Sequence, residues 1–500
     1  SIGNILLFLY LLWIGIDMFL RRPKRALRQK RRPRAGYAAG EREAGRSALI
    51  GPALSRPSDV PGYERTRYTK KDLILVGMLT LVYACVAFVN LGSFKAPQTY
   101  WRPLHSGEGF YADLGREKRI ARVYYFFGLG AGSYTLEFSQ DHKNWSAPVT
   151  ISQPTRFDAV QWRFTALDLK ARYLKVTAET PGVMLDELAL FGRDSRKPLA
   201  IKKITPFAVN AAAGAGKDSG AAAVPGRTPQ QGSPGNVFDE QDTIAYIPGY
   251  LDGFIFDEVY FARTGYENLL GIPPSETTHP PLGKLIISLG ILLFGMVPWG
   301  WRFMGTLFGV LMVPLMYAFG KKLFGKTRAA FFTAFLFTFD FMHFVQTRIA
   351  TIDVYAVFFI ILMYYFMYDY FRMSFFKNPF KQTLRPLFYS GICFGLGAAC
   401  KWTALYGALG LAGIFFYTVW KRSREYAAAR RVVKQARRTV LYPGPARVSV
   451  YQGKTVPQAE SLVCRAVTNS SGQNSAEPCF GVWCFLSSFP RSYIFWPTFP

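Results

Sequence analysis

The sequence predicts a multi-span α-helical membrane protein with an inserted, extracytoplasmic all-β jelly-roll sandwich. Half of its 500 residues are hydrophobic, and they are gathered into blocks rather than scattered along the chain. Crossing a bilayer as a helix takes about 20 mostly apolar residues. The segments that approach or exceed this length are 73–92, 303–319, 329–347, 354–371 and the long run 386–420. Between the first two of them, short alternating segments predict strands instead.

The net charge of +28 is concentrated beside these apolar blocks, at 21–34, 321–328, 372–385 and 421–438. Clusters of Lys and Arg mark the cytoplasmic ends of membrane helices. If 21–71 is cytoplasmic, every basic loop falls on that side provided that 386–420 is two spans with an outer turn near Lys401. This arrangement argues against nucleic acid as a partner and in favour of the membrane.

We therefore expect the following division of the chain. The N-terminal part comprises a membrane helix at 1–20, a basic cytoplasmic loop at 21–71 and a membrane helix at 72–92. The external part comprises a sandwich at 93–198, a flexible linker at 199–237 and a loop that carries the candidate site at 238–302. Membrane helices follow within 303–422, at 303–319, 329–347, 354–371, 386–400 and 402–420, and a basic segment with a disordered tail ends the chain at 423–500.

Two features qualify this division. The apolar stretch 285–297 is too short to cross a bilayer, so it is expected to be a helix lying at the outer interface. The sequence also begins inside an apolar run, and its residues after about 440 lack periodicity. We expect a piece of a longer protein whose tail is either a disordered end or a chimeric junction.

The segment 93–198 resembles a discoidin-type (galactose-binding-like) jelly roll. Its short alternating bursts are separated by turns rich in Gly and Asp, as in an antiparallel sandwich. The landmarks that carry the resemblance are Ala112-Asp113-Leu114-Gly115, Ser139-Gln140-Asp141, Trp145, Ala171-Arg172-Tyr173 and Asp186-Glu187-Leu188 followed by Phe191-Gly192. Such a domain either binds a glycan or acts as a spacer packed against the membrane part. The external segment has no cysteine, so it needs no disulfide.

Charged residues at the outer ends of the spans are the candidates for chemistry, because charge at membrane depth is costly and usually functional. Asp257 and Glu258 stand before the interfacial helix, where a carboxylate could act as general base on an incoming hydroxyl. The alternative is a solvated ion-pair cluster with Arg263. His279 precedes two prolines, which hold it in an extended conformation.

A second group closes the span 329–347. Asp340 and His343 share a helix face, as a functional or a buried structural pair. Arg348 is suited to a phosphate, because a guanidinium binds phosphate through two parallel hydrogen bonds. Lys401 at the predicted outer turn either reaches the interface or faces inward toward a phosphate.

Several short motifs together resemble the protein O-mannosyltransferase family, in the order found there. They are Phe238-Asp239-Glu240-Gln241-Asp242, Phe256-Asp257-Glu258, Thr278-His279-Pro280-Pro281-Leu282-Gly283-Lys284, Phe339-Asp340 with His343 and Gln346-Thr347-Arg348, Ile352-Asp353, and Cys400-Lys401-Trp402. The resemblance covers 72–92 and 238–422.

This resemblance implies a GT-C fold and an inverting transfer of mannose from a polyprenyl (dolichyl) phosphate to Ser or Thr hydroxyls of proteins, outside the plasma membrane. It implies Asp257 as catalytic base, with Glu258 orienting the base or the acceptor. The donor phosphate would be held by Arg348, with Lys401 and His279 beside it. Supporting roles would fall to Arg263, Asp340, His343 and Asp353.

The resemblance implies no resident cofactor and no metal-ligand set, although a divalent cation is compatible with it. The lipid-linked donor and the acceptor protein are the expected partners. The sandwich stands where the family has a plain loop, and the family's later spans are missing, so parts of the donor groove are expected to be absent and the chain itself could be inactive. Two alternatives stay open: a related GT-C transferase that moves another sugar, such as arabinose, to a lipid or glycan, and a non-catalytic membrane-anchored glycan-binding protein.

Overall fold

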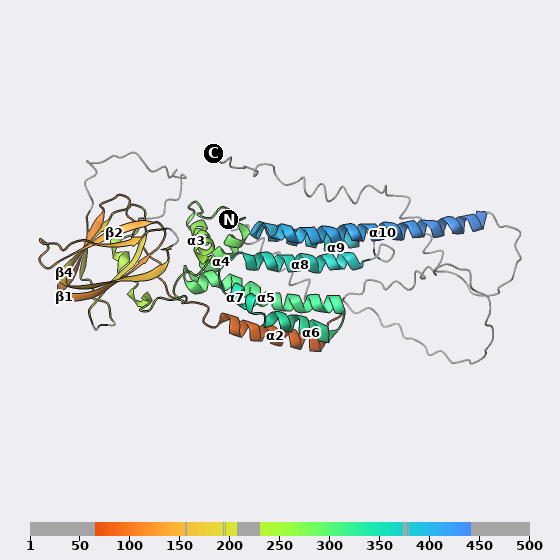
Figure 1. Ribbon diagram of the computed structural model, residues 1–500, viewed down its shortest axis with the longest axis horizontal. Helices are drawn as coiled ribbons and strands as arrows, with labels where there is room; N and C mark the ends of the chain where they lie inside the picture. Colours follow the sequence, from red (N-terminus) through yellow and green to blue (C-terminus); the bar gives the residue numbers. More distant parts are fainter. Residues whose placement is uncertain are drawn as a thin grey trace. The chain divides into compact units, whose positions relative to one another are not determined.

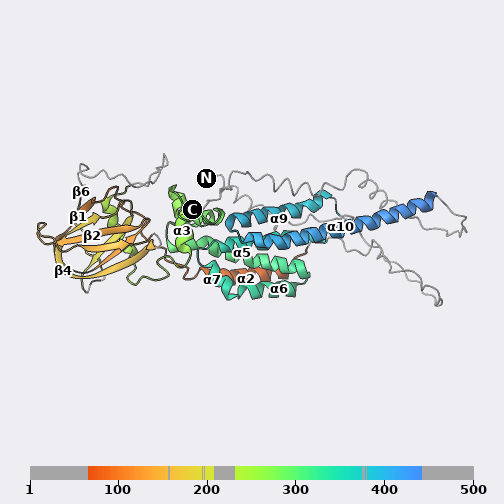
Figure 2. The same ribbon diagram turned by 45° about the horizontal axis from the view of Figure 1, so that its top comes forward.

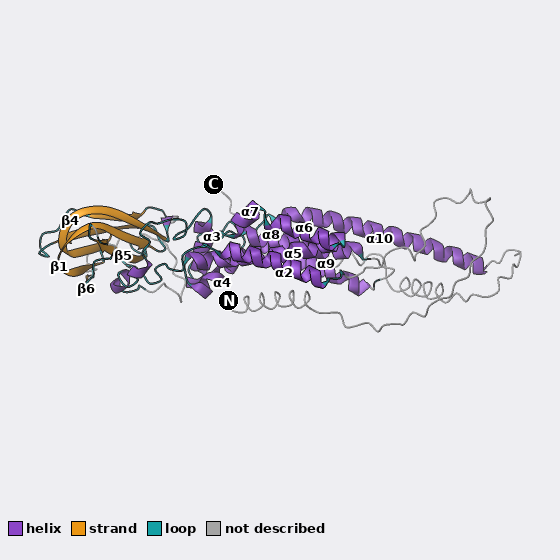
Figure 3. Ribbon diagram, turned by 90° about the horizontal axis from the view of Figure 1, so that it is seen from below, coloured by secondary structure: helices purple, strands orange, loops and turns teal. Residues whose placement is uncertain are grey.

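The computed structural model describes residues 66–441, except 156–157, 194, 196, 208–230, 374–377 and 379 (Figure 1). The expected span at 1–20, most of the loop 21–71 and the tail after 441 lie outside the described residues. The described part consists of a β domain and a set of α-helices, shown by type in Figure 3. The predicted fold class, a multi-span helical membrane protein with an inserted β domain, is confirmed.

The described helical part is built from helices α2 to α10. Their bounds are α2 Lys70–Phe88, α3 Glu258–Leu270, α4 Leu282–Phe294, α5 Pro298–Phe324, α6 Thr327–Thr338, α7 Phe341–Thr347, α8 Asp353–Arg372, α9 Phe380–Cys400 and α10 Ala404–Leu441. Within the described part, α2, α5, α8 and the first 25 residues of α10 are long and apolar enough to cross a membrane, and α6 with α7 adds a fifth span if the bent pair counts as one.

The segment predicted as one helix at 329–347 is broken. Helices α6 and α7 meet at 59°, with Phe339 and Asp340 between them. Asp340 adopts an extended conformation, and its carboxylate accepts a hydrogen bond of 2.6 Å from the backbone N–H of His343. Aspartate is among the residues that most favour this N-cap position, so the local sequence restarts the helix here.

The β domain is built on two long antiparallel strands. Its strands are β1 Gly109–Phe127, β2 Gly132–Ser139, β3 Val149–Gln153, β4 Gln161–Ala178, β5 Leu185–Phe191 and β6 Lys203–Phe207. The described strands form one sheet in the order β3-β2-β4-β1-β5, with β6 paired to β1. Apolar side chains such as Phe110, Leu136, Val176 and Leu188 are buried in its core together with Trp101.

Strand β6 corrects the prediction of a flexible linker over all of 199–237. Residues Lys203–Phe207 pair in register with Gly109–Asp113 of β1, and Pro234–Val237 form a turn of 3-10 helix. Only the stretch poor in apolar bulk, 208–236, has the composition of a linker, and most of it lies outside the described residues. The stretch Ile204-Thr205 has the β-branched side chains that favour a strand.

Close backbone contacts hold the short helices α3 and α4 against the start of α5. A Cβ atom on Gly290 of α4 would lie 2.4 Å from the carbonyl oxygen of Gly300 in α5, so only glycine permits this approach. The Ser288 hydroxyl donates to the carbonyl of Gly265 in α3 at 2.8 Å. Helix α2 packs on α5 and α6 through a core that includes Leu79. Helices α8, α9 and α10 run side by side (Figure 1), and Figure 2 shows α9 and α10 from another direction. This arrangement brings α3 and its N-terminal acids to the first turn of α5.

Candidate functional site

A buried ion pair fixes the first turn of α3. The Glu258 carboxylate is fully buried and accepts two hydrogen bonds from the Arg302 guanidinium, at 2.7 and 2.8 Å. It also accepts from the backbone N–H groups of Ile255 and Ala350, each at 3.0 Å, and from the Trp301 indole at 3.2 Å. Both of its oxygens are therefore fully used, and the expected role of Glu258 in orienting an acceptor directly does not fit this geometry. Its position makes it a positioning residue.

The Arg302 side chain extends the same network. Its remaining N–H groups donate to the carbonyls of Leu91 at 2.9 Å and Gly253 at 3.0 Å. The pair thus joins the chain after α2, the loop before α3, the start of α5 and the loop before α8. Sequence reasoning did not single out Arg302, although a cation in an apolar span is the signal by which the other candidates were chosen.

Asp257 precedes this pair and has a different environment. It is half-buried, makes no capping hydrogen bond to α3, and lines a cavity of about 520 Å³. Its neighbour Phe256 has a left-handed backbone, with φ of 52°. That conformation is unusual for an aromatic residue, and such outliers cluster at functional sites. The turn presents the Asp257 carboxylate to the cavity while Glu258 faces the protein interior.

The opposite wall of this cavity is formed by the loop 275–279. Glu276 accepts a hydrogen bond of 2.6 Å from the Lys284 ammonium and further hydrogen bonds from Thr278 and from the backbone N–H of His279. Lys284 also donates to the His279 carbonyl at 2.9 Å, and the His279 ring packs edge-on against Phe261. Asp257 and His279 therefore line the same cavity. Glu276 was not predicted.

Arg263 also lines the cavity, but its partner is not the one anticipated. Its Nε donates to Glu267 at 2.8 Å, one helical turn along α3, and both side chains are buried. Glu267 in turn accepts from the backbone N–H of Ser275 at 2.6 Å. The alternative of a solvated cluster of Arg263 with Asp257 and Glu258 is therefore wrong. Glu267, paired with Arg263, holds the cavity's loop against α3.

The motif around Lys401 lies beside the same loop. The Lys401 ammonium contacts both carboxylate oxygens of Asp353, at 2.7 and 2.8 Å. The indole of Trp402 donates to the carbonyl of Thr278 at 3.2 Å. A Cβ atom on Gly283 would lie 2.7 Å from the Ile352 side chain. Three motifs that are far apart in the sequence therefore meet here, and Lys401 is an ion-paired residue rather than a lone cation.

Arg348 is tied to the end of α2. One of its terminal nitrogens donates to the carbonyls of Val89 at 2.6 Å and Asn90 at 2.8 Å, and its guanidinium lies over the Phe344 ring. It does not line the cavity of Asp257. A short stretch of backbone nevertheless links Arg348 to Glu258, because the N–H of Ala350, two residues after Arg348, donates a hydrogen bond to Glu258.

Asp340 and His343 belong to the packing of α7. The His343 ring is buried and stacks on Tyr83 of α2, with centroids 5.0 Å apart, and on Phe337, with centroids 4.1 Å apart. The exposed Asp340 contacts the backbone of His343 and caps the helix. The two side chains do not form the buried structural pair that was the alternative, because Asp340 is exposed and contacts only the backbone of His343. Neither side chain lines the cavity of Asp257.

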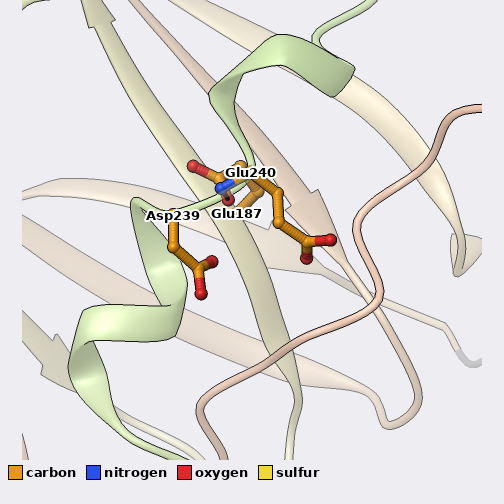
Figure 4. A group of neighbouring side chains, drawn as sticks. All are labelled: Glu187, Asp239 and Glu240. Carbon is orange, nitrogen blue, oxygen red and sulfur yellow. Dashed lines mark hydrogen bonds between the residues drawn. The ribbon is translucent and has the colours of Figure 1, made fainter.

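A separate acidic group joins the segment after the linker to the β domain. Glu187, Asp239 and Glu240 each offer a carboxylate oxygen within 4.8 Å of the others, a set that could hold a cation with oxygen ligands (Figure 4). Glu240 accepts from the backbone N–H groups of Gln98 at 2.7 Å and Thr99 at 2.8 Å, and Glu187 accepts from the backbone N–H of Glu240. Burial raises the pKa of Glu187 to about 9. These contacts fasten the motif that begins at Phe238 to strand β5.

Known proteins resemble part of this chain. Residues 278–435 match the family model described as dolichyl-phosphate-mannose-protein mannosyltransferase. The polyprenol-phosphate-mannose–protein mannosyltransferase of Mycobacterium tuberculosis is 28% identical over 257 residues, 45% of this chain and 48% of that protein. The protein of the same name from Corynebacterium glutamicum is 29% identical over 222 residues, 41% of each. The chain therefore spans about half the length, or less, of these relatives.

The family model begins at Thr278, so it includes His279, Arg348, Asp353 and Lys401 but not Asp257. A solved structure, CpGH89CBM32-6 produced by Clostridium perfringens, is 18% identical and covers 20% of this chain and 82% of its own. Its TM-score of 0.17 supports no statement about the fold of the β domain.

The ion pair of Glu276 and Lys284 predicts an acid-sensitive site. Burial raises the pKa of Glu276, but the hydrogen bonds from Lys284, Thr278 and His279 outweigh it and lower the pKa from 4.5 to about 2. A carboxyl group with a lowered pKa stabilises the fold above its unfolded pKa, and this contribution is lost as the pH falls through the folded value. We expect thermal melting to show that Glu276→Gln is less stable than the parent at pH 7 and that the gap narrows between pH 4.5 and pH 2. A gap that is independent of pH would contradict the assignment.

Proposed function

We propose that this chain carries the site that transfers mannose from a polyprenyl-phosphate donor to Ser or Thr hydroxyls of proteins, because residues 278–435 match the mannosyltransferase family model and its relatives bear the name of that enzyme. One observation of the structure supports this proposal above the others. A carboxylate without a capping or ion-pair role, Asp257, shares a cavity with the Thr278–His279 loop, directly above a bundle of membrane-spanning helices.

In this proposal Asp257 is the general base. It accepts the proton of the acceptor hydroxyl while the hydroxyl oxygen bonds to C1 of the mannose. The bond between C1 and the phosphate oxygen breaks on the opposite face, so the anomeric centre is inverted and polyprenyl phosphate leaves. Glu258 acts through Asp257, because its own oxygens are saturated by Arg302 and by backbone N–H groups.

The leaving phosphate needs cations on the side away from the base. His279 lies on the cavity's far wall, and the buried Lys284 stands behind that wall, paired with Glu276. Lys401 stands beside the same wall with Asp353. Arg348 is the further candidate, and its Nε is buried without a hydrogen-bond partner among the described residues. A phosphate that enters between these groups would compete with Asp353 for Lys401 and would offer the oxygen that the Arg348 Nε lacks.

We place the site on the extracytoplasmic face of the plasma membrane. The site gathers at the C-terminal end of α2 and the N-terminal ends of α5, α8 and α10. The opposite ends of α2, α5 and α8 carry Lys71, Lys321 and Arg372, and Lys421 lies about halfway along α10. Positive residues at one set of helix ends favour the cytoplasm for that face, which puts the cavity outside.

A related transferase that acts on a lipid or glycan, or that moves another sugar, would give a different product. The test compares the parent and the Asp257→Asn variant, with mass spectrometry of a co-expressed acceptor protein. We expect hexose on Ser or Thr with the parent and a loss of at least about 100-fold with the variant, since a general base contributes about that much. Asp242→Asn, which alters an exposed acid paired with Lys95, is the matched control and should keep full transfer.

Two results would contradict the proposal. Retained transfer by Asp257→Asn, in protein that inserts and melts like the parent, would remove Asp257 as the base. Hexose on a lipid with none on Ser or Thr would support the related transferase instead.

We also propose that the β domain binds a glycan, for which it has a surface of aromatic rings. Tyr111 lies 4.7 Å from both His142 and Phe207 and 5.6 Å from Trp145, measured between ring centroids. His142 has a left-handed backbone, with φ of 64°. Flat rings with adjacent polar groups are suited to the apolar face of a sugar, and the neighbouring pair of Arg172 and Asp113 can supply hydrogen bonds.

The glycan proposal predicts that Trp145→Ala weakens the binding of a mannosylated Ser/Thr peptide by about fivefold, since one aromatic contact contributes about 1 kcal/mol. Titration calorimetry on the full chain measures this. Phe164→Ala removes an exposed ring elsewhere on the sheet and should leave binding unchanged. Equal affinity of the parent and Trp145→Ala would support the spacer alternative.

A further inference from the structure

A second cavity lies at the end of the helical bundle opposite the candidate site. It has a volume of about 660 Å³ and is enclosed by the first turns of α2 and the connection from α5 to α6. The cavity lies at the N-terminal end of α2, whereas Arg348 contacts Val89 at the C-terminal end of that helix. The 19 residues of α2 set these two ends about 28 Å apart. The residues that line it are Lys71, Leu75, Lys326, Thr327, Arg328, Phe331 and Phe332.

The cavity carries an unbalanced positive charge. Two of the four cations in the basic segment 321–328 are buried and paired, Lys321 with Asp72 at 3.1 Å and Lys322 with Asp369 at 2.8 Å. The other two, Lys326 and Arg328, are exposed and line the cavity with Lys71, and none of the three forms an ion pair with a described residue. Of the described residues that line the cavity, none is acidic. Three positive charges therefore converge on it.

A buried network of hydrogen bonds fixes the backbone beside these three cations. Asp72, next to Lys71, closes a capping box with Thr69 and accepts from the hydroxyl of Tyr317 at 2.9 Å. The ammonium of Lys321 bridges Asp72 to the hydroxyl of Thr327, at 2.8 Å, and Thr327 lies between Lys326 and Arg328. Because this buried network locks both walls together, an anion would bind a preformed site and lose less entropy in ordering it.

The remaining walls are apolar and open toward the outside of the bundle. Leu75, Phe331 and Phe332 complete the lining, and Phe332 is 59% exposed. Next to them on α2 and α6, Leu73, Ile74 and Leu336 are 59 to 69% exposed. In a membrane protein such a surface faces hydrocarbon, whereas a free anion would gain nothing from it. The cavity combines a cationic centre with an apolar exit.

We propose that this cavity binds the phosphate-bearing headgroup of an anionic glycerophospholipid, with its acyl chains lying along α2 and α6. Lys71, Lys326 and Arg328 contact the phosphate, and Phe331, Phe332 and Leu75 contact the glycerol and the first methylene groups. Clustered cations at the cytoplasmic border of membrane helices select anionic lipids over neutral ones. The site is independent of the transferase chemistry and would hold the α2–α6 edge of the bundle in the leaflet that carries such lipids.

The test measures lipid retained by the purified full chain in native mass spectrometry, with phosphatidylglycerol and phosphatidylcholine offered in mixed micelles. We expect phosphatidylglycerol to be preferred by the parent. The variant Lys71→Gln, Lys326→Gln and Arg328→Gln should bind it at least about tenfold more weakly, since each cation near the surface contributes about fivefold. The matched control, Lys381→Gln, Arg385→Gln and Arg430→Gln, removes three exposed cations from the other basic clusters and should keep the preference.

The charge-conserving variant Lys71→Arg, Lys326→Arg and Arg328→Lys should also keep it, which separates loss of charge from misfolding. Equal losses in the triple variant and its control would show a diffuse electrostatic attraction and would overturn the site. Displacement of the lipid by inorganic phosphate at millimolar concentration would overturn a lipid as the ligand and identify a free anion. Binding of the two lipids in equal amounts would overturn the proposal as well.

Discussion

The ion pair between Glu258 and Arg302 is the contact on which the candidate site depends. Burying two charges is expensive, and the cost is recovered only where every polar atom finds a partner. Here the carboxylate receives five hydrogen bonds and the guanidinium reaches two further carbonyls, so the pair fixes four separate stretches of chain around one point. Asp257 is held at the edge of this point and faces the cavity. The position of the proposed base is thus a consequence of the pair beside it.

The same principle operates at the other end of the bundle, with a different outcome. Lys321 and Lys322 form buried ion pairs with Asp72 and Asp369, and these pairs connect the ends of α2, α5 and α8. The cations that have no acidic partner stay at the surface, where they line the second cavity. A positive cluster in a membrane protein therefore divides into charges that hold helices together and charges that are available to a ligand. Only the contacts of the folded chain distinguish the two.

The sequence was sufficient for the fold class, because that follows from local signals. Apolar blocks predict spans, and Asp257 with the Thr278–Lys284 motif was predicted at the outer ends of those spans. The partners of each charge could not be predicted, because they lie far away in the chain. Glu258 binds Arg302, 44 residues away, and Ala350, 92 residues away, while Lys401 binds Asp353, 48 residues away. Nothing in the spacing of Asp340 and His343 shows that a cap, rather than a side-chain pair, joins them, although an aspartate inside a Phe-rich helix could have predicted the break.

A double-mutant cycle measures directly how strongly Glu258 and Arg302 are coupled. The free energy of unfolding would be measured in micelles for the parent, Glu258→Gln, Arg302→Met and the double variant. Each single change leaves a buried charge without its partner and should cost about 3–5 kcal/mol. The double variant should cost no more than one of them, which gives a coupling energy of at least about 3 kcal/mol. Additive costs, with no coupling between the two residues, would contradict the claim that this pair builds the site.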